Sequence, residues 1–352
     1  MPVRTVWTLA LNNQLTFAPA FDAERAYFSI EHDRLVAYEL LDGAQCWITD
    51  ARPVVDPAVG NELVFVAEAE SLVALHAADG SVAWRVDLAE PLAMRPVFDN
   101  GWLVGATADG VVLAFRAADG HLVWKQALGA PAHAPPALAA DRVYLSATNG
   151  RVVSLRVETG EPVWERRVGG SPNEILALDD RLYVGSTDNF LYCLMTKDGR
   201  IDWRWRTGAD IVAAPIADER AVYFVSYDNV LRALDRTSGG QKWMQPLPLR
   251  PTAAPAIAGS TLLVGGQSPT IRTYNVKDGA PTTEINAGAE VGAPPHVLSQ
   301  PVTGLPMVLV VTRDIAKGAT ATLSVRSIDP IPTPVGPLGN PVMPGPTPPI
   351  RP

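Results

Sequence analysis

Cysteine and histidine are the side chains best suited to nucleophilic, redox or metal chemistry, and this chain has few of them. Cys46 and Cys193 are 147 residues apart, so they form neither a CxxC motif nor an adjacent pair. The histidines are scattered, without the short His or Cys spacing of a zinc site: His32, His76, His121, His133 and His296. We therefore predict neither a metal site nor a catalytic residue.

Carboxylates recur mainly in turns. Asp and Glu side chains in short polar segments brace the backbone through local hydrogen bonds. The pair Asp179-Asp180 also falls between two apolar runs, in a predicted hairpin turn. The chain has no GxSxG motif, no phosphate-binding glycine loop and no EF-hand pattern. The acidic residues therefore indicate structural turns rather than acid–base catalysis.

The composition favours a large all-β fold. The 352 residues are 47% hydrophobic and 19% charged, with 28 Gly and 32 Pro, which suits many short strands joined by tight turns. The formal net charge of −8 makes nucleic acid a poor partner. No stretch approaches the roughly 18–20 apolar residues of a membrane span, and the first residues lack the apolar core of a secretory signal. We expect no nucleic-acid partner and no transmembrane segment.

Tryptophan shows that the chain is built from repeats. Seven tryptophans occupy the same position in successive repeats, which we call the tryptophan column, whereas Trp102 and Trp205 lie outside it. Thr283 takes the column position in the next repeat, and an eighth unit without its tryptophan ends near Ile328. A fixed period of this length is typical of repeat architectures. Seven tryptophans recur at a period of 37 to 40 residues: Trp7, Trp47, Trp84, Trp124, Trp164, Trp203 and Trp243.

Other columns divide each unit into four short strands. Alternating runs flank polar tips such as Asn149-Gly150, which tolerate the positive φ of two-residue hairpin loops. A second glycine turn lies four residues before the tryptophan column at every column position after Trp7. We expect proline at the first residue of a strand, where its missing N–H breaks no ladder bond. A proline recurs twelve residues after the tryptophan column in six units: Pro19, Pro96, Pro136, Pro215, Pro255 and Pro295.

Eight units of four antiparallel strands predict an all-β, eight-bladed β-propeller. The chain starts with a lone strand over residues 5–11, and the last unit, over about residues 290–328, is incomplete. We therefore expect the N-terminal strand to close the ring by completing the C-terminal blade, so that no terminal blade is exposed. The predicted propeller covers residues 1–328.

The turn before each tryptophan has a specific form. It is complete at residues 233–243, ALDRTSGGQKW, with weaker copies starting at Ala37, Ala74, Ala114, Ser154 and Cys193. This segment resembles the tryptophan-docking motif of the PQQ-like, or quinoprotein-like, β-propeller family. WD40 repeats fit less well, because aspartate never follows these tryptophans. The resemblance implies that the seven tryptophans pack structurally between blades, and Cys193, in a column of small residues, is expected to be buried.

The resemblance implies two alternative functions. Compact single-ring members of the family, such as the outer-membrane assembly factors of the BamB type, are not enzymes, whereas PQQ-dependent alcohol dehydrogenases are built on the same blades. Those enzymes carry two adjacent disulfide-bonded cysteines and a Glu, an Asn and an Asp around calcium, and this chain lacks the adjacent pair. We therefore predict a monomeric, non-catalytic, BamB-like scaffold of the periplasm or cell envelope that binds a protein or peptide and needs no cofactor. A PQQ-dependent alcohol or sugar oxidoreductase is the alternative.

The predicted binding site is the rim of the central channel. Loops from the tryptophan column to the proline column converge there, and such concave openings commonly bind ligands. Their polar side chains interrupt an otherwise small, Ala- and Pro-rich set: Arg52, Arg95, His133, Glu174, Asp210 and Arg250.

Residues 329–352 form a separate segment, IDPIPTPVGPLGNPVMPGPTPPIRP from Ile328 onward. Its density of proline and glycine, with almost no charge, is incompatible with a strand ladder or a packed core. We expect an extended, largely disordered tail that acts as a spacer.

Overall fold

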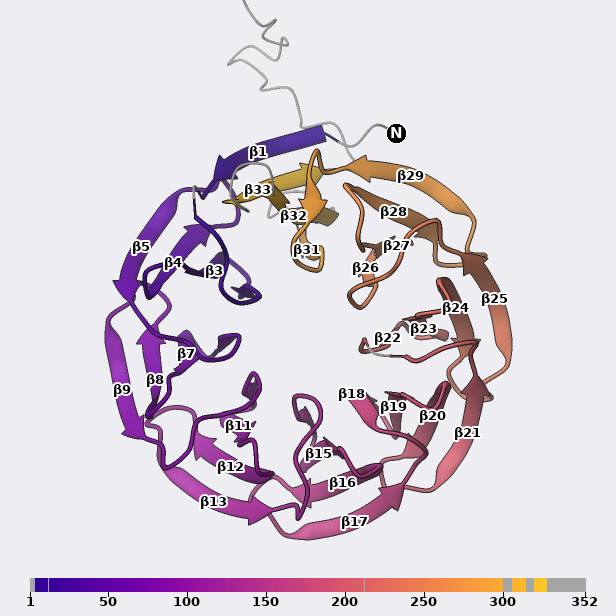
Figure 1. The fold of residues 1–352 in the computed structure, drawn as a ribbon, viewed down its shortest axis with the longest axis horizontal. Coiled ribbons are helices and arrows are strands. Elements are labelled where there is room, and N and C mark those ends of the chain that lie inside the picture. Colours follow the sequence, from indigo (N-terminus) through magenta and orange to yellow (C-terminus); the bar gives the residue numbers. More distant parts are fainter. Residues whose placement is uncertain (1–3, 12, 212, 300–305, 315–319, 328–352) are drawn as a thin grey trace, which may run out of the picture.

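A computed structural model describes residues 4–11, 13–211, 213–299, 306–314 and 320–327. Eight β-sheets stand radially around a central opening, with their innermost strands toward the opening and their outermost strands on the perimeter (Figure 1). This arrangement confirms the predicted eight-bladed propeller. The predicted tail, residues 329–352, lies outside the described residues.

Each blade is an antiparallel sheet of four main strands, numbered here from blade 1 (β2–β5) to blade 8 (β31–β33 with β1). The innermost strands are β2 (Ala20–Phe21), β6 (Ala58–Gly60), β10 (Val97–Asp99), β14 (Ala137–Ala139), β18 (Pro172–Leu178), β22 (Ile216–Ala217), β26 (Ala256–Ala258) and β31 (His296–Ser299). The second strands are β3 (Arg25–Ile30), β7 (Leu63–Ala67), β11 (Trp102–Ala106), β15 (Arg142–Ala147), β19 (Arg181–Ser186), β23 (Ala221–Ser226), β27 (Thr261–Val264) and β32 (Pro306–Asp314).

The outer half of each blade follows the same order. The third strands are β4 (Arg34–Glu39), β8 (Ser71–His76), β12 (Val111–Arg116), β16 (Arg151–Arg156), β20 (Phe190–Met195), β24 (Val230–Asp235), β28 (Thr270–Asn275) and β33 (Thr320–Ser327). The outermost strands are β5 (Gln45–Asp50), β9 (Val82–Asp87), β13 (Leu122–Ala127), β17 (Pro162–Arg167), β21 (Ile201–Arg206), β25 (Gln241–Pro246), β29 (Pro281–Asn286) and β1 (Arg4–Ala10). A further short strand in blade 8, β30 (Glu290–Val291), pairs with β32.

Local turn chemistry differs in two details from the predictions. In blade 1 both His32 (66°) and Asp33 (57°) have a positive φ at the tip between the second and third strands. In blades 3 to 6 only the second residue of the pair does, as at Gly110 (88°) and Asn229 (58°), each of which donates its N–H three residues back. These are type I turns followed by one left-handed residue, not two-residue loops. The proline column lies one residue before the innermost strand, as Pro96 does before β10, so proline stays outside the ladder.

The seven tryptophans each join one blade to the next. The indole N–H, carried on an outermost strand, donates to a backbone carbonyl at the end of the third strand of the following blade. The pairs and their Nε1–O distances are Trp7–Leu40 (3.2 Å), Trp47–Ala77 (2.9 Å), Trp84–Ala117 (2.9 Å), Trp124–Val157 (2.7 Å), Trp164–Thr196 (2.8 Å), Trp203–Arg236 (3.2 Å) and Trp243–Val276 (3.0 Å).

A glycine of the following blade lies against the face of each indole. Gly239 has φ of +70°, and a Cβ at this position would lie 2.6 Å from the Trp203 ring. Both the backbone conformation and the close approach exclude a side chain. The glycine turn before each tryptophan therefore receives the tryptophan of the preceding blade.

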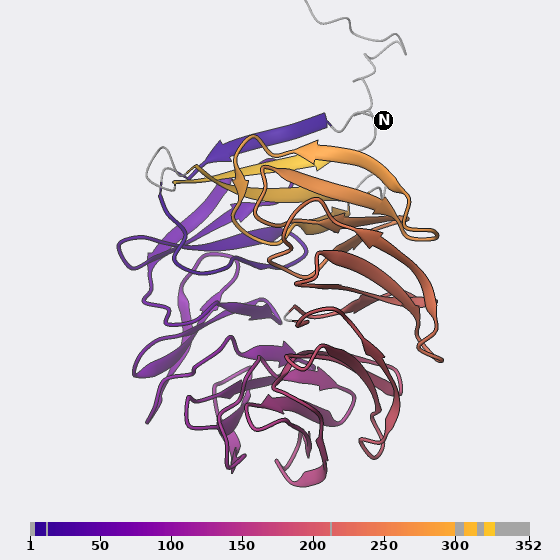
Figure 2. The ribbon, with the colours of Figure 1, turned by 45° about the vertical axis from the view of Figure 1, so that its right-hand side comes forward.

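The ring closes between the two ends of the chain. β1 pairs antiparallel with β33, with Arg4 opposite Ser327 and Ala10 opposite Thr322. The indigo N-terminal strand accordingly lies beside the yellow C-terminal strands in both ribbon views (Figures 1 and 2). The predicted closure by the N-terminal strand is confirmed.

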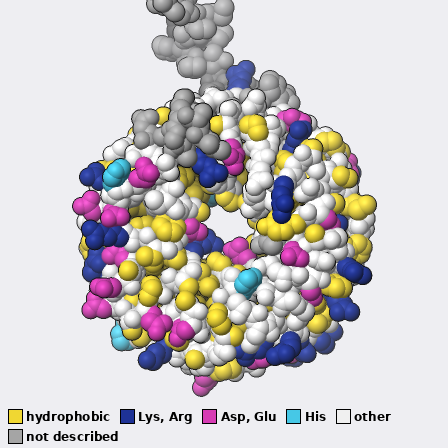
Figure 3. Space-filling view, viewed as in Figure 1, with side chains coloured by type: hydrophobic (Ala, Val, Ile, Leu, Met, Phe, Trp, Pro, Cys, Tyr) yellow, Lys and Arg dark blue, Asp and Glu magenta, His cyan; other side chains and the backbone are white. Residues whose placement is uncertain are grey.

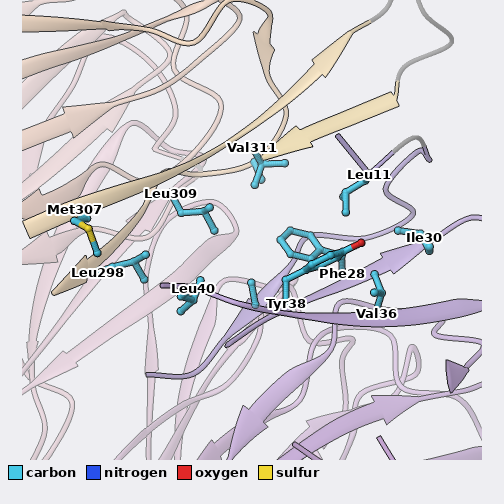
Figure 4. Packing of buried hydrophobic residues seen from close by; sticks show 12 residues of the cluster. Leu11, Phe28, Ile30, Val36, Tyr38, Leu40, Leu298, Met307, Leu309 and Val311 are labelled. Atoms are coloured by element: carbon cyan, nitrogen blue, oxygen red, sulfur yellow. The ribbon is translucent and has the colours of Figure 1, made fainter. Parts of the chain in front are cut away.

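A hydrophobic cluster fills the junction between blades 8 and 1. Leu298, Met307, Leu309 and Val311 from blade 8 face Phe28 and other residues of blade 1 (Figure 4). Leu11, which follows β1, is buried in the same cluster, while Trp7 and Leu9 pack against it half-buried. The N-terminal segment therefore contributes apolar contacts to the closure in addition to its backbone pairing.

His296 lies on the innermost strand of blade 8, at the same junction. Its ring stacks on Phe21 of blade 1, with centroids 3.9 Å apart and planes inclined by 10°. Burial lowers the pKa of His296 to about 4, so the imidazole is neutral near pH 7.

Both cysteines are free thiols. Cys193 is completely buried in β20, as its small-residue column predicts, and burial raises its pKa to about 12. Burial also raises the pKa of Cys46, as does its contact with Glu39 at 3.4 Å. Neither thiol is activated as a nucleophile, since the thiolate is the reactive form.

Adjacent glycines test the tryptophan contact. Gly239→Ala should lower the free energy of unfolding by about 2–4 kcal/mol, because it adds left-handed strain to a collision with Trp203. Gly240→Ala, whose new methyl group would meet only Ser238 Oγ at 3.4 Å, is the matched control and should change it by less than about 1 kcal/mol. Urea unfolding measures both, and equal effects would show that the glycine–indole contact is not specific.

Removing residues 1–11 should destabilise the whole ring. The deletion leaves the outer edge of β33 unpaired and uncovers the cluster between blades 8 and 1, at a cost on the order of 5 kcal/mol for the apolar groups alone. Thermal unfolding followed by circular dichroism should show a large fall in Tm. An unchanged Tm would mean that β1 is dispensable for closure.

The neutral His296 should make stability fall on mild acidification. Its pKa is lower in the folded than in the unfolded state, so the unfolded chain takes up a proton first as the pH falls below about 6.5. The loss should reach about 2 kcal/mol at pH 5 and level off at about 3 kcal/mol only below pH 4. Urea unfolding of the wild type and of His296→Phe between pH 7 and pH 5 measures it. The variant should lack this component, and parallel profiles would contradict the prediction.

Candidate partner-binding face

One face of the ring carries the loops that lead from each outermost strand to the innermost strand of the next blade. We call these the crossover loops, and because the strands alternate in direction, the turns between second and third strands lie at the same end. The crossover loops and the turns between second and third strands together form the crossover face. Isolated bridges such as Leu92–Thr107 and Ala132–Ala147 tie crossover loops to the ends of second strands, so these loops are held in place.

Arg95 and Glu174 meet although they belong to different blades. Arg95 lies in the crossover loop before blade 3, and Glu174 on the innermost strand of blade 5. Their Nη2–Oε1 distance is 3.4 Å, with side chains 44% and 37% exposed. An exposed pair of this kind adds little to stability. Both groups therefore remain accessible to a partner at the mouth of the channel.

Glu174 lies in a strand rather than in the predicted loop. Blade 5 has a longer innermost strand, β18, in which Pro172 already pairs with Ser186 and the register shifts before Ile175. The buried Asn173 holds this irregular segment: its Nδ2 donates to the Ile211 carbonyl (2.6 Å), and its own carbonyl accepts from Ser146 Oγ (2.6 Å). The prediction of a loop was wrong because a side-chain amide replaces the missing ladder bonds.

Arg52 bridges blades 1 and 2. Its guanidinium lies 3.2 Å from the Asp33 carboxylate and is 79% exposed, while its backbone N–H donates to Glu68 at 3.1 Å. Burial alone would raise the pKa of Glu68, but the hydrogen bonds from Arg52 and Arg85 outweigh it and hold that pKa below its usual value. The backbone of this loop is thus fixed, whereas the exposed guanidinium of Arg52 is free to reorient.

The other three predicted residues lie apart on the same face. The His133 backbone N–H donates to the Ser146 carbonyl (2.7 Å), and the Asp210 carbonyl accepts from Tyr227 (3.0 Å). The Arg250 guanidinium lies 4.7 Å from the centre of the Tyr227 ring, a cation–π contact. The structure thus places all six residues on the crossover face, but only Arg95 and Glu174 touch each other.

Tyr227 is a surface residue that the sequence reasoning missed. It is 40% exposed at the tip between β23 and β24, where the three preceding blades have Ala108, Thr148 and Thr187. An aromatic residue after three small ones in this column was a usable signal. It was missed because only the crossover loops, and not the hairpin tips beside them, were considered.

The crossover face carries charged side chains but, among the described residues, no cluster of metal ligands. The space-filling view shows side chains of both charges around an open channel (Figure 3). In the part of the chain that the structure describes, no three His, Cys, Asp or Glu side chains are placed to share a metal ion. The same residues include no apolar helix of the length that a bilayer requires.

A family model described as outer membrane protein assembly factor BamB matches the chain over residues 4–93, 68–177 and 176–308. The chain belongs to this family. BamB of Yersinia pestis is 26% identical over 110 residues, which cover 30% of this chain and 28% of that protein. The chain therefore aligns with less than a third of the length of this curated relative.

Solved structures share the fold at low identity. BamB from Moraxella catarrhalis superimposes with a TM-score of 0.73 and 19% identity, covering 93% of this chain and 98% of that one. The quinohemoprotein alcohol dehydrogenase ADHIIG from Pseudomonas putida HK5 gives 0.74 and 15%, covering 99% of this chain and 78% of that one. At such identities the likeness shows the propeller alone, which this BamB-family chain shares with enzymes.

The residues present do not match the PQQ site that the sequence comparison with such enzymes implies. The chain has no adjacent cysteines, and within the described ring Cys46 and Cys193 belong to blades 1 and 5 as separate free thiols. The described carboxylates form no cluster that could hold calcium.

Proposed function

We propose that this chain is a non-catalytic, BamB-like scaffold of the cell envelope whose crossover face binds a protein or peptide partner. The family match supports the scaffold and its location, because the family is described by a role in assembling outer membrane proteins. The choice of face rests on the structure of the rim itself.

One observation carries the proposal: exposed binding groups stand on loops that are already ordered. Arg52 and Arg95 are 79% and 44% exposed at their side chains, while the surrounding backbone is bonded to strand ends. A partner that binds here loses little entropy in ordering the surface. The stacked Arg250 and Tyr227 add an amphipathic group of the kind enriched at protein interfaces.

Charges of both signs at the rim favour a partner that carries both acidic and basic side chains. The Arg95–Glu174 and Arg52–Asp33 pairs are exposed and weak, so a partner can exchange each for a contact of its own. Such exchange contributes to specificity and association rate more than to affinity. We therefore expect binding that weakens with rising salt.

A triple variant tests the crossover face. Arg52→Ala, Arg95→Ala and Glu174→Ala together should lower capture of partner protein from an envelope extract at least 10-fold, as measured by affinity purification and quantitative mass spectrometry. The Tm should stay nearly constant, because exposed substitutions usually change stability by only about 0.5 kcal/mol each.

The control is a triple variant with the same charge change on the opposite face. Arg116, Arg156 and Glu161 lie at or next to the turns between third and fourth strands, and their replacement by Ala should leave capture unchanged. Equal loss in both variants would contradict a site on the crossover face. Stoichiometric PQQ binding with calcium, together with dye reduction in the presence of an alcohol or sugar, would favour the oxidoreductase instead.

A further inference from the structure

Arginines gather on the outer wall of the ring where blades 4 and 5 meet. Arg204 and Arg206 lie two residues apart on β21, on the side that faces blade 4, where Phe190 packs against blade 4 residues. The Arg204 guanidinium lies 4.9 Å from the centre of the Phe190 ring. Arg166 extends from β17 toward blade 5 and donates to the Gly199 carbonyl at 2.7 Å. Lys and Arg side chains are numerous along the lower right part of the ring in Figure 3.

None of these three arginines has a carboxylate partner among the described residues. Three arginines on the outer two strands of other blades do have such a partner, at Nη–O distances of 2.7 Å for Arg85–Glu68, 2.9 Å for Arg151–Glu165 and 2.6 Å for Arg232–Asp228. In blade 5 the Asp188 carboxylate instead accepts from the Tyr192 hydroxyl at 2.5 Å. Blade 5 thus presents cations that its own chain leaves without counter-ions.

The other side of β21 is apolar. Trp205, which lies outside the repeating tryptophan column, alternates with the two arginines and packs half-buried against the cluster shared with blade 6. Met244, on the outermost strand of blade 6, faces blade 5 through its pairing with Arg232 and is 56% exposed. The edge strand β21 therefore has a basic side toward blade 4 and an apolar side toward blade 6.

β21 is the free edge of its sheet. The sheet order in blade 5 runs from β18 to β21, and no described strand pairs with the outer side of β21. Such an edge can accept an added strand through its backbone groups. The alternation of Arg204, Trp205 and Arg206 would then set which side chains the added strand needs.

We propose that the outer edge of β21 binds an extended segment of a partner protein in which acidic and apolar residues alternate. The acidic side chains pair with Arg204 and Arg206, and the apolar ones lie along Trp205 and Met244. Opposite-charge and aromatic–aliphatic pairs across strands are both favourable, and arginine pairs strongly with carboxylates. This surface is distinct from the crossover face.

A strand explains the surface better than an anionic membrane does. The two kinds of side chain alternate along a single strand and lie on its opposite sides, as the period of two of a β-strand requires. The chain as a whole carries a net charge of −8, which opposes adsorption to an acidic bilayer. Phosphatidylglycerol vesicles therefore serve as the competing ligand in the test.

The test uses a fluorescein-labelled peptide that alternates glutamate and valine over eight residues, titrated with the whole chain and followed by anisotropy. Arg204→Ala with Arg206→Ala should weaken binding at least 10-fold. Lys197→Ala with Lys277→Ala removes the same charge from exposed turns and should leave binding unchanged. Equal weakening by both double variants would overturn the proposal.

Two further ligands separate a strand from simple charge attraction. A peptide of four glutamates followed by four valines, and an N-methylated version of the alternating peptide that cannot form a ladder, should both bind at least 10-fold more weakly than the alternating peptide. Binding as tight as the parent by either one would overturn strand addition. Binding to phosphatidylglycerol vesicles without binding to the alternating peptide would assign the arginines to a membrane instead.

Discussion

Docking of each indole onto the next blade is the interaction on which the ring depends. A single four-stranded sheet has two faces to cover and cannot do so alone. Trp164 shows how the repeat solves this: it donates to the Thr196 carbonyl at 2.8 Å while its ring lies on Gly199. The hydrogen bond satisfies a carbonyl at a strand end, and the ring removes apolar surface from water. Because the contact joins neighbours only, the same 40-residue unit can be repeated around a circle.

One junction lacks this contact. The column position on β29 is Thr283, so blade 7 offers no indole to blade 8, and Ile285, Val308 and Val310 instead form an aliphatic cluster between them. Blade 8 is also the blade that is completed by β1. The variation in the repeat is thus concentrated where the two ends of the chain meet.

Uniform blades leave function to the parts that do not repeat. Crossover loops and hairpin tips carry no docking contact, so their side chains can differ from blade to blade, as Arg52, Tyr227 and Arg250 do. The outermost strands share the tryptophan column, while the residues that follow it differ from blade to blade. The residues after Trp203 are therefore free to form the Arg204–Trp205–Arg206 segment, which no other blade has.

The sequence by itself determined the ring: the tryptophan period, the glycine turns and the lone first strand were enough to predict eight blades and their closure, since each feature is local and repeated. Tertiary structure alone decided which side chains meet. Arg95 and Glu174 are 79 residues apart and pair because blades 3 and 5 both face one narrow channel, and Asn173 turned a predicted loop into a strand by contacts to two other blades. Periodicity fixes the order of neighbours around a ring, but it carries no information about contacts across the channel or between unlike loops.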